Sequence, residues 1–444
     1  MVLEAVKPLT ADEIAELCTR HTLFDWSVQA GLHPLTVATA KGVRFTTVDG
    51  RSFLDFNSQL MCVNAGHGDR RIIDAIKAQA EQLTYVMPNL ATEPRARLGQ
   101  KLAQLLPGDI DKVFFTLGGT DANENAIKIA RAVTGRPKVL ARYRSYHGST
   151  GAAVQATGDP RRWPNEGAGG AVVHVRDPYR GIDRQADPAA TALDELEETV
   201  QLEGPQTIAA FILEPVVGTN GVLIPPDGYL EGVREICTRH GILLITDEVM
   251  SGFGRTGRWF AVDHWGVVPD LITMAKGLTS AYVPLGAVGM RPHVAEYFED
   301  HTFWGGLTYN SHALGCAAAL ATIRAYEEDD MVGNAQRLGE VLAGLHRRLQ
   351  ERHPCVGAVR SIGLFGCIEL VRSRRTLEPL APFNGSSPEM KGIAQALLDA
   401  GLFTFVRWNT LMTNPPLCIT QAELEEGFEI LDTALEIGDR AVTD

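Results

Sequence analysis

Lys276 follows a short apolar run at residues 271–274 and precedes a glycine. A lysine among apolar neighbours tends to lose its charge, and a neutral amine is a nucleophile. Asp247 follows another apolar run, at residues 242–246, and could hold the proton of a pyridine nitrogen. Together the amine and the carboxylate suggest a lysine Schiff base with pyridoxal phosphate. Taken singly, each residue is also compatible with a solvated position at a strand end.

A glycine turn between a predicted strand, residues 112–116, and a predicted helix is a candidate phosphate site. Thr120 is a good N-cap for that helix. Gly118 and Gly119 let the backbone approach an anion at the positive end of the helix. The alternative interpretation is an ordinary helix cap after a strand.

Tyr146 and His147 lie just past a predicted strand at residues 138–142. An aromatic ring at this position could stack on a flat heterocycle, although an ordinary polar loop is the alternative. No serine or cysteine nucleophile in a G-x-S-x-G turn accompanies them, which disfavours a hydrolase.

Residues 252–257 match the dinucleotide pattern G-x-G-x-x-G literally. That pattern indicates a nicotinamide site only when it directly follows a strand and opens a helix. Here residues 248–251 intervene between the preceding strand end and the pattern, and residues 258–265 have little helical character. We therefore disfavour dinucleotide binding.

The elements that must position these residues alternate between helices and short apolar runs from about residue 90 to 320. This alternation predicts an α/β fold with a mostly parallel sheet covered by helices on both faces. Reactive groups gather beyond the carboxyl ends of such strands. Lys276, Asp247 and Glu214, which follows the run at residues 208–213, all fall there.

At 444 residues the chain exceeds one hydrophobic core, so we expect more than one domain. Residues 66–320 form the predicted large, cofactor-binding domain. Residues 321–444 form a smaller α+β domain, with predicted helices at 334–352 and 388–400. The segment 1–65, which carries a hairpin with an Asp-Gly turn, is expected to join that small domain.

The net charge of −13, from 41 basic and 54 acidic residues, argues against nonspecific nucleic-acid binding. No stretch reaches the roughly 18 apolar residues of a membrane span, and the start of the chain does not resemble a signal peptide. Seven cysteines without a C-x-x-C pair favour a reducing, cytoplasmic setting. We expect no metal site.

Residues 115–124, 245–257 and 274–277 closely resemble class III aminotransferases, the ω-aminotransferases of the fold-type I pyridoxal phosphate superfamily. The resemblance runs from about residue 35 to the C-terminus in unbroken order. Residues 158–165, 305–312 and 409–417 look more narrowly like the taurine–pyruvate aminotransferase branch.

The resemblance implies a role for each of five residues around the cofactor ring. Lys276 would bond the cofactor covalently and Asp247 would pair with the pyridine nitrogen. Val249 and Tyr146 would cover the two ring faces. Glu214 would lie near the phenolic oxygen.

At the phosphate, the resemblance implies that Gly119 and Thr120 hold the group. Thr308 would reach the phosphate of the neighbouring subunit, so the active sites would be shared within a homodimer, or within each dimer of a tetramer. We also assign His147, beside Tyr146, to the cofactor site.

The implied activity moves an amino group from an amine to a keto acid such as pyruvate or 2-oxoglutarate in two half-reactions. An acidic, taurine-like amine would need an arginine that engages a carboxylate or sulfonate. Arg407 and Arg162 are the candidates, and Trp26 and Trp163 could line the pocket. An aminomutase, epimerase or decarboxylase using the same cofactor is the alternative. A non-catalytic regulator that binds the cofactor is a second alternative, which the acidic charge opposes.

Overall fold

The computed structural model describes residues 7–167, 171–178 and 188–443. Residues 1–6, part of the stretch inspected for a targeting signal, therefore lie outside the described residues. Within the described ranges, no helix combines the length and the apolar character needed to cross a membrane. The same ranges hold no group of three or more His, Cys, Asp or Glu side chains placed to bind a metal ion.

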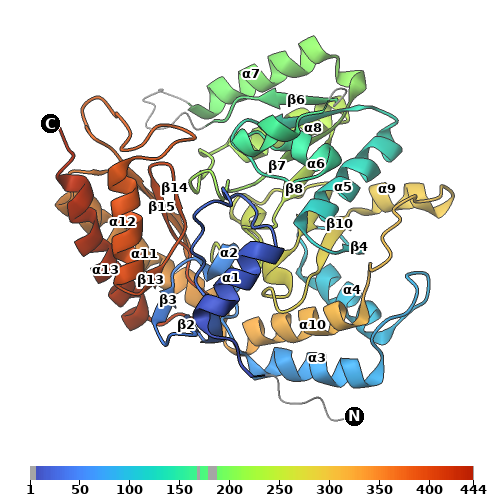
Figure 1. The fold of residues 1–444 in the computed structure, drawn as a ribbon. Coiled ribbons are helices and arrows are strands. Elements are labelled where there is room, and N and C mark those ends of the chain that lie inside the picture. Colours follow the sequence, from blue (N-terminus) through green and yellow to red (C-terminus); the bar gives the residue numbers. More distant parts are fainter. Residues whose placement is uncertain (1–6, 168–170, 179–187, 444) are drawn as a thin grey trace.

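A seven-stranded sheet forms the centre of the molecule (Figure 1). Its strands lie in the order β4-β10-β9-β8-β7-β5-β6. Their bounds are β4 Lys112–Thr116, β5 Lys138–Arg142, β6 Val172–Val175, β7 Ile208–Leu213, β8 Leu243–Asp247, β9 Leu271–Met274 and β10 Gly286–Met290. Only β10 runs antiparallel to its neighbours. The predicted mostly parallel sheet is confirmed, and β10 is the reversed strand.

Helices cover both faces of this sheet. Alternate side chains of β7 point to opposite faces, as the period of a strand requires. Ala210 and Ile212 pack in the apolar cluster of α5, Gly119–Thr134. Phe211 packs in the opposite cluster, which holds the buried side chains of α7 and α8. The bounds of these two helices are Pro188–Glu203 and Tyr229–His240.

Two smaller sheets lie beside the large one. The first has the order β1-β2-β3-β13, and the second has the order β11-β12-β15-β14 with every pair antiparallel. Their bounds are β1 Val37–Lys41, β2 Arg44–Thr47, β3 Ser52–Asp55, β11 Val356–Ile362, β12 Phe365–Leu370, β13 Leu402–Phe403, β14 Val406–Arg407 and β15 Thr410–Thr413. Pairing of β13 with β3 joins the N-terminal strands to the C-terminal segment. The domain boundaries near residues 65 and 320 stay predictions.

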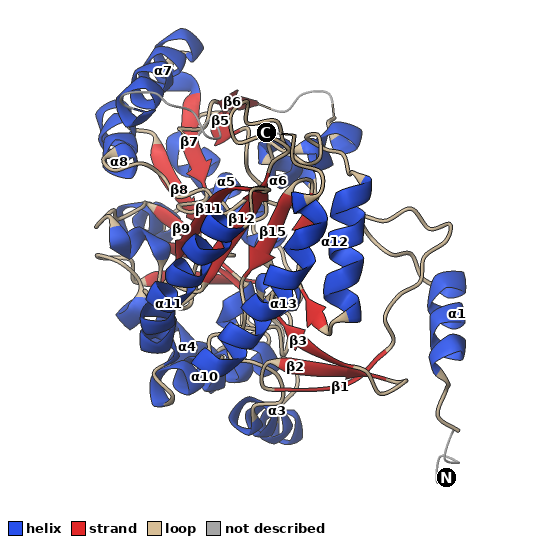
Figure 2. Ribbon diagram, turned by 90° about the vertical axis from the view of Figure 1, so that its left-hand side faces the viewer, coloured by secondary structure: helices blue, strands red, loops and turns tan. Residues whose placement is uncertain are grey.

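The remaining helices surround these sheets. Their bounds are α1 Ala11–His21, α2 Ser58–Met61, α3 Arg70–Gln82, α4 Glu93–Leu105, α6 Gly151–Ala156, α9 Pro292–Ala295, α10 Ala313–Glu328, α11 Met331–Arg352, α12 Pro388–Asp399 and α13 Gln421–Asp439. Helix α10 packs against α3 and α4. Helix α1 has no buried residue and stands away from the rest of the chain (Figure 2).

Candidate active site

The carboxyl ends of three adjacent parallel strands bring three predicted residues to one edge of the central sheet. Glu214 directly follows β7, Asp247 is the last residue of β8, and Lys276 follows β9 after one alanine. All three line a small hollow of about 40 Å³, which we call the inner cavity. An adjoining hollow of about 370 Å³, the outer cavity, shares Lys276 with it. Residues from separate strands thus surround one space.

Lys276 lies in a constrained turn. Its φ of +38° falls in the left-handed region that side chains other than glycine rarely adopt. A Cβ on the next residue, Gly277, would lie 2.7 Å from the Asn64 side-chain nitrogen, which explains the glycine. The Tyr326 hydroxyl of α10 donates to the Gly277 carbonyl at 2.6 Å and holds the turn.

The environment of the Lys276 amine favours its neutral form. Burial lowers its pKa, although Cys62, Asp247 and Glu214 pull in the opposite direction. The amine also borders both cavities, so its nitrogen can be reached by a ligand. A neutral and accessible amine is the form that attacks a carbonyl carbon.

Asp247 is buried and held by three donors. Its Oδ2 accepts from Asn123 Nδ2 at 2.7 Å, and its Oδ1 accepts from the Val249 backbone N–H at 3.0 Å. His147 Nδ1 lies 2.8 Å from Oδ2 and is the donor when Asp247 is ionised. The Thr273 hydroxyl of β9 in turn donates to Asn123 Oδ1 at 2.7 Å. This network fixes the carboxylate at the wall of the inner cavity.

Glu214 is fixed by backbone donors. Its Oε1 accepts from the Tyr146 N–H at 3.0 Å, and its Oε2 accepts from the Gly218 N–H at 2.8 Å. Burial raises the pKa of Glu214; His147 works against this shift, and the nearby charge of Asp247 adds to it. Burial therefore favours the protonated form of Glu214 more than water would.

The N-terminus of α5 forms another wall. Gly119 is its first residue and Gly118 its N-cap, so no side chain caps the first backbone N–H groups. Those N–H groups and the helix dipole suit an anion. A Cβ on Gly119 would lie 2.8 Å from Val249 Cγ1, so the glycine lets α5 approach the segment after β8. Thr120 lines both cavities.

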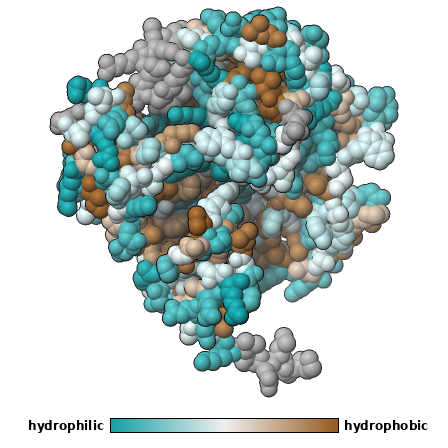
Figure 3. All heavy atoms as spheres, turned by 45° about the horizontal axis from the view of Figure 1, so that its top comes forward, coloured by the Kyte–Doolittle hydropathy of each residue, from teal (hydrophilic) through white to brown (hydrophobic). Residues whose placement is uncertain are grey.

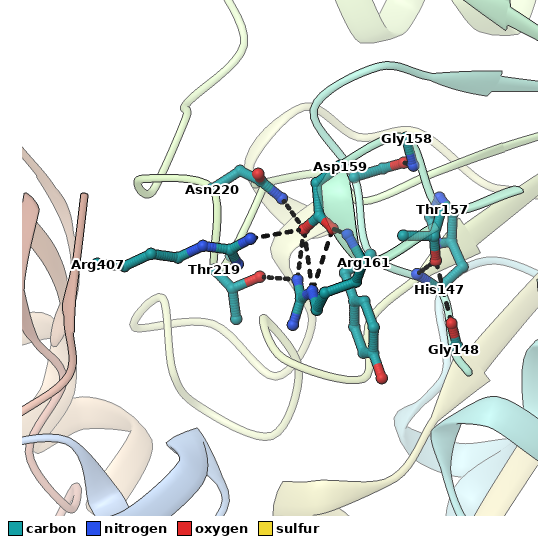
Figure 4. Close-up of polar contacts among 12 residues, drawn as sticks. His147, Gly148, Thr157, Gly158, Asp159, Arg161, Thr219, Asn220 and Arg407 are labelled. Atoms are coloured by element: carbon teal, nitrogen blue, oxygen red, sulfur yellow. Dashed lines mark hydrogen bonds and ion pairs between the residues drawn. The ribbon is translucent and has the colours of Figure 1, made fainter. Parts of the chain in front are cut away.

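Two arginines share one carboxylate, that of Asp159 (Figure 4). Arg407 lies outside the linings of both cavities. The Arg161 guanidinium lies 3.7 Å from the centre of the Tyr146 ring and 5.6 Å from that of Trp26. Arg407 Nη2 lies 3.2 Å from Asp159 Oδ2, which also binds Arg161. Arg161 itself lines the outer cavity, together with Trp26 and Tyr146.

Comparison with known proteins gives the family of the chain. Residues 27–435 match the family aminotransferase class-III. The chain belongs to the class III aminotransferases. The structure is similar to a taurine:2-oxoglutarate aminotransferase from Bifidobacterium kashiwanohense solved with PLP and glutamate. That similarity has a TM-score of 0.95 and 42% identity, and covers 98% of this chain and 100% of the other.

Two curated relatives extend the comparison to further class III aminotransferases. The taurine–pyruvate aminotransferase of Rhodobacter capsulatus is 35% identical, with 90% of this chain and 91% of that protein covered. The diaminobutyrate–2-oxoglutarate transaminase of Halomonas elongata is 36% identical, with 88% and 87% covered. The chain is thus an enzyme that transfers amino groups between amines and keto acids.

Class III aminotransferases depend on pyridoxal phosphate, and the residues that line the two adjoining cavities of this member fit that group. The Lys276 amine matches its aldehyde, and the Asp247 carboxylate matches its ring nitrogen. The open N-terminus of α5 matches its phosphate. Tyr146 and Val249 line the same space as candidates for the two ring faces.

Some predicted residues of this aminotransferase lie elsewhere. Arg162 forms an ion pair with Glu166 and lies outside the linings of both cavities, so its predicted contact with the substrate stays a prediction. Trp163 is 55% exposed and lies outside both linings. The reason is local: in a 3₁₀ turn such as Pro160–Asn165, successive side chains point about 120° apart, so Arg161 faces the cavity and Arg162 does not.

Thr308 also lies outside the two linings. It is exposed, and its carbonyl accepts from the Tyr85 hydroxyl at 3.0 Å. Its predicted contact with the phosphate of a neighbouring subunit stays a prediction.

The literal dinucleotide pattern has a structural role. No helix opens at residues 252–257; the next element is a short 3₁₀ turn, Ala261–His264. Arg255 of this segment is buried, and its guanidinium donates to the Leu364 and Pro415 carbonyls, the Ser58 hydroxyl and the Asn64 amide oxygen. The arginine ties the segment to distant parts of the chain.

Sequence reasoning missed Asn123, Arg161 and Asp159. Asn123 lies one turn after Gly119 on α5, so helical spacing from the predicted phosphate site could have indicated it. For Asp159 the signal is an N-cap pattern, because its side chain accepts from the Arg161 N–H at 3.0 Å. Neither pattern indicates a function by itself, because the partners of these side chains, Asp247 and Arg407, come from other segments of the chain.

Proposed function

We propose that this aminotransferase accepts an amine with a distal acid group, of the taurine kind, and passes its amino group to pyruvate or 2-oxoglutarate. The observation that carries the proposal is the Arg161 guanidinium on the outer cavity wall, in the same lining as Lys276. A guanidinium is suited to a carboxylate or sulfonate. The names of the relatives, with taurine, pyruvate and 2-oxoglutarate among their substrates, support this choice.

We assign the chemical steps to three residues of the inner cavity. Pyridoxal phosphate supplies an electron-accepting ring when it is bound. Lys276 would hold the cofactor at rest. Once an incoming amine has displaced it, the Lys276 amine would carry the proton from the substrate carbon to the cofactor carbon on the other side of the shared nitrogen. Asp247 would keep the ring nitrogen protonated. Glu214, whose pKa burial raises, can share its proton with an adjacent oxygen.

Two further groups position the reactants. Gly119 and Thr120 bind the phosphate through the N-terminus of α5. Tyr146 and Val249 keep the ring between them, and His147 orients Asp247 through the 2.8 Å contact. The role of these residues is to align the amine of Lys276 with the reacting carbon.

We propose a homodimer as the active form. Exposed apolar side chains gather in the loops near α3, α4 and α10, and include Tyr85, Met87, Leu90, Trp304 and Tyr309. A groove between these three helices has a volume of about 1080 Å³. Thr308 lies in the same region, which supports its contact with a partner's phosphate. Exposed apolar side chains that gather in one region are typical of an association site.

We propose the cytoplasm as the location of the enzyme. All seven cysteines are free thiols, and four of them are buried. Unpaired cysteines are expected in a reducing compartment.

The experiment that tests the substrate class is a panel of amine donors, each combined with pyruvate or with 2-oxoglutarate. We expect acidic amines such as taurine to exceed neutral amines of equal length in kcat/KM. We also expect Arg161→Ala to lower kcat/KM for acidic amines by roughly 10-fold or more, because it removes a charge-assisted hydrogen-bond donor. Equal rates for acidic and neutral donors would refute the proposal.

A further inference from the structure

One wall of the outer cavity is made by an irregular segment, residues 57–62, which follows β3. Three of its residues line that cavity: Leu60, Met61 and Cys62. Lys276 belongs to the same lining. The short helix α2 within the segment contains residues with non-helical torsion angles. The conformation of this segment therefore shapes the space beside the reacting amine.

The backbone of the segment is strained at three positions. Ser58, Gln59 and Met61 have φ angles of +48°, +57° and +53°, in the region that favours glycine. Gln59 also has a ψ of −101°, which lies outside the small left-handed region that other side chains occasionally adopt. Strain of this kind persists only where the surrounding contacts enforce it.

The contacts that enforce the strain converge on Gln59. Asp55, the last residue of β3, is fully buried, and its two carboxylate oxygens accept from the Gln59 backbone N–H at 2.9 and 3.0 Å. Its Oδ2 also accepts from Gln59 Nε2 at 2.9 Å, and His67 Nε2 lies 2.9 Å from the same oxygen. The Gln59 carbonyl accepts from Asn57 Nδ2 at 2.7 Å. One carboxylate thus holds both the backbone and the side chain of Gln59.

The flanks of the segment are anchored separately. Arg255 Nη2 donates to Ser58 Oγ at 2.9 Å and to Asn64 Oδ1 at 2.8 Å. Ser58 Oγ in turn donates to the Asn414 carbonyl at 2.7 Å. These four residues are buried, whereas Leu60 between the flanks is 42% exposed. The flanks are therefore fixed without Gln59, and the part between them depends on it.

We propose that Gln59 is a positioning residue that limits the length of the amine substrate. Gln59 lies outside the linings of both cavities, so it acts through its neighbours. Its bonds to Asp55 keep Leu60 and Met61 in the wall of the outer cavity, and this wall limits the chain of the donor. Without the side-chain bond the strained backbone relaxes, the wall withdraws and longer donors fit. The inference rests on the proposed function, since it takes the outer cavity as the place of the amine.

The test uses Gln59→Ala, which removes the amide but keeps a residue that disfavours a positive φ. The holoenzyme is mixed with one amine and no keto acid, and the change in cofactor absorbance gives the rate constant of the half-reaction. The acidic donors are β-alanine and 5-aminopentanoate, and the neutral donors are propylamine and pentylamine. In each pair we expect the long-to-short ratio of rate constants to rise about tenfold, as for a lost hydrogen bond to a charged group.

Two variants control for a general effect on the fold. Gln59→Gly loses the same amide but tolerates the positive φ, so it should keep a ratio close to that of the wild type. Gln350→Ala is the matched control, because it loses the bond from Gln350 Nε2 to the Gly357 carbonyl outside both linings. A loss of stability alone lowers the rates of both donors and leaves their ratio unchanged. If Gln59→Ala does not fold, Gln59→Met supplies the same test with a side chain of similar length.

Alkylation of Cys62 gives a second measurement, which needs no turnover. Cys62 is half-buried in the same segment, and its modification by iodoacetamide is followed by mass spectrometry of its peptide. We expect the rate in Gln59→Ala holoenzyme to rise about fivefold or more, because a loosened segment opens more often. Gln59→Gly and Gln350→Ala should match the wild type.

An unchanged length ratio in Gln59→Ala would overturn the inference, as would a shift towards shorter donors or an equal shift in Gln59→Gly. If a donor pair is not converted, an unchanged rate of Cys62 alkylation would overturn it instead. Failure of the proposed function has a different signature. In that case the wild-type enzyme would convert propylamine as fast as β-alanine, whatever the length ratios of the variants.

Discussion

At the residue scale, the chemistry that we propose for this aminotransferase depends on one amine in a strained turn. The positive φ of Lys276 places its side chain between the two cavities, and the Tyr326 contact with Gly277 holds that turn. Backbone strain of this kind costs about 1–3 kcal/mol and is retained where the surrounding structure enforces it. The surroundings then lower the pKa of the amine by burial.

We predict that Lys276→Ala abolishes transamination and the visible absorbance of the bound cofactor. Loss of proton transfer alone costs about 10²–10⁴-fold in rate, and the covalent bond is lost as well. Stopped-flow half-reactions and an absorption spectrum measure both effects. Lys138→Ala is the control. Lys138 is the first residue of β5, at the end of the strand away from the site, and it pairs with Glu203. Retention of activity by Lys276→Ala would refute the assignment.

For Arg407→Ala we predict a KM for the keto acid that rises about tenfold, with a smaller change in kcat. The reason is that Arg407 contributes binding of the acid group rather than a chemical step. Steady-state kinetics with saturating amine provide the measurement. A KM equal to that of the wild type would show that Arg161 alone binds the acid.

At the scale of the element, the start of α5 must lie close to the segment after β8. We predict that Gly119→Ala weakens cofactor binding, because its Cβ would lie 2.8 Å from Val249 Cγ1 and one of the two walls must move. A rise of about tenfold in the cofactor Kd is expected from a misplaced phosphate site. Fluorescence titration of the apoenzyme measures it. Gly99→Ala in α4 is the control, since nothing lies within 4 Å of the added Cβ.

Helix α11 contributes a buried histidine to the stability of the C-terminal part. His346 lies between α11 and β15, with Nε2 3.0 Å from the Thr413 hydroxyl. Burial, with a smaller effect of Arg360, lowers the pKa of His346 to about 3. In the unfolded chain its pKa is about 6.5. Between these two values the unfolded state binds a proton that the folded state does not bind, so stability falls as the pH falls from 6.5 towards 3.

We therefore predict that acid destabilises the wild type more than His346→Gln. Between about pH 6.5 and pH 5 the histidine should account for at most ~2 kcal/mol of lost stability. Urea unfolding at both pH values measures the difference. His21→Gln, on the exposed helix α1, should keep the wild-type dependence. Identical pH dependence of His346→Gln and the wild type would contradict the prediction.

At the scale of the whole molecule, the surface is mostly hydrophilic, with smaller hydrophobic areas between the polar residues on the face shown in Figure 3. The excess of 54 acidic over 41 basic residues makes the chain acidic. The positive charge needed for an acidic substrate is therefore local, and it is concentrated in Arg161 and Arg407. Association of two chains would leave these arginines in each active site while it covers the apolar loops near Thr308.

Hybrid dimers test whether the active site is shared. Lys276→Ala and Thr308→Asp should each be inactive or strongly impaired alone, the second because its carboxylate repels the partner's phosphate. After random exchange of subunits, about half of the dimers are hybrids with one intact site, so about a quarter of the wild-type activity should return. No recovery after exchange verified by native mass spectrometry would contradict a shared site.

Sequence patterns predicted the bounds of the strands better than the directions in which the strands pair. The apolar runs of β4, β5, β7 and β9 have the predicted bounds, because a buried strand needs a continuous apolar segment of that length. Strand β8, Leu243–Asp247, lies one residue later than the predicted strand at 242–246 and therefore includes Asp247 itself. The reversed strand β10 was not predicted, since its five residues, two of them glycines, carry no distinct pattern and its direction depends on pairing with β4 and β9.

By itself, the sequence determined the chemical class of this protein. Lys276, Asp247 and Glu214 each follow or end an apolar run, and parallel strands place their carboxyl ends at one edge, so local patterns were sufficient to bring them together. Only the tertiary structure decided which arginine lines the outer cavity. Arg161 and Arg162 differ by a rotation within one short turn, and Asp159 meets Arg407 across 248 positions. No pattern of neighbouring residues in the sequence indicates either arrangement. Both depend on side-chain contacts between segments that only the fold brings together.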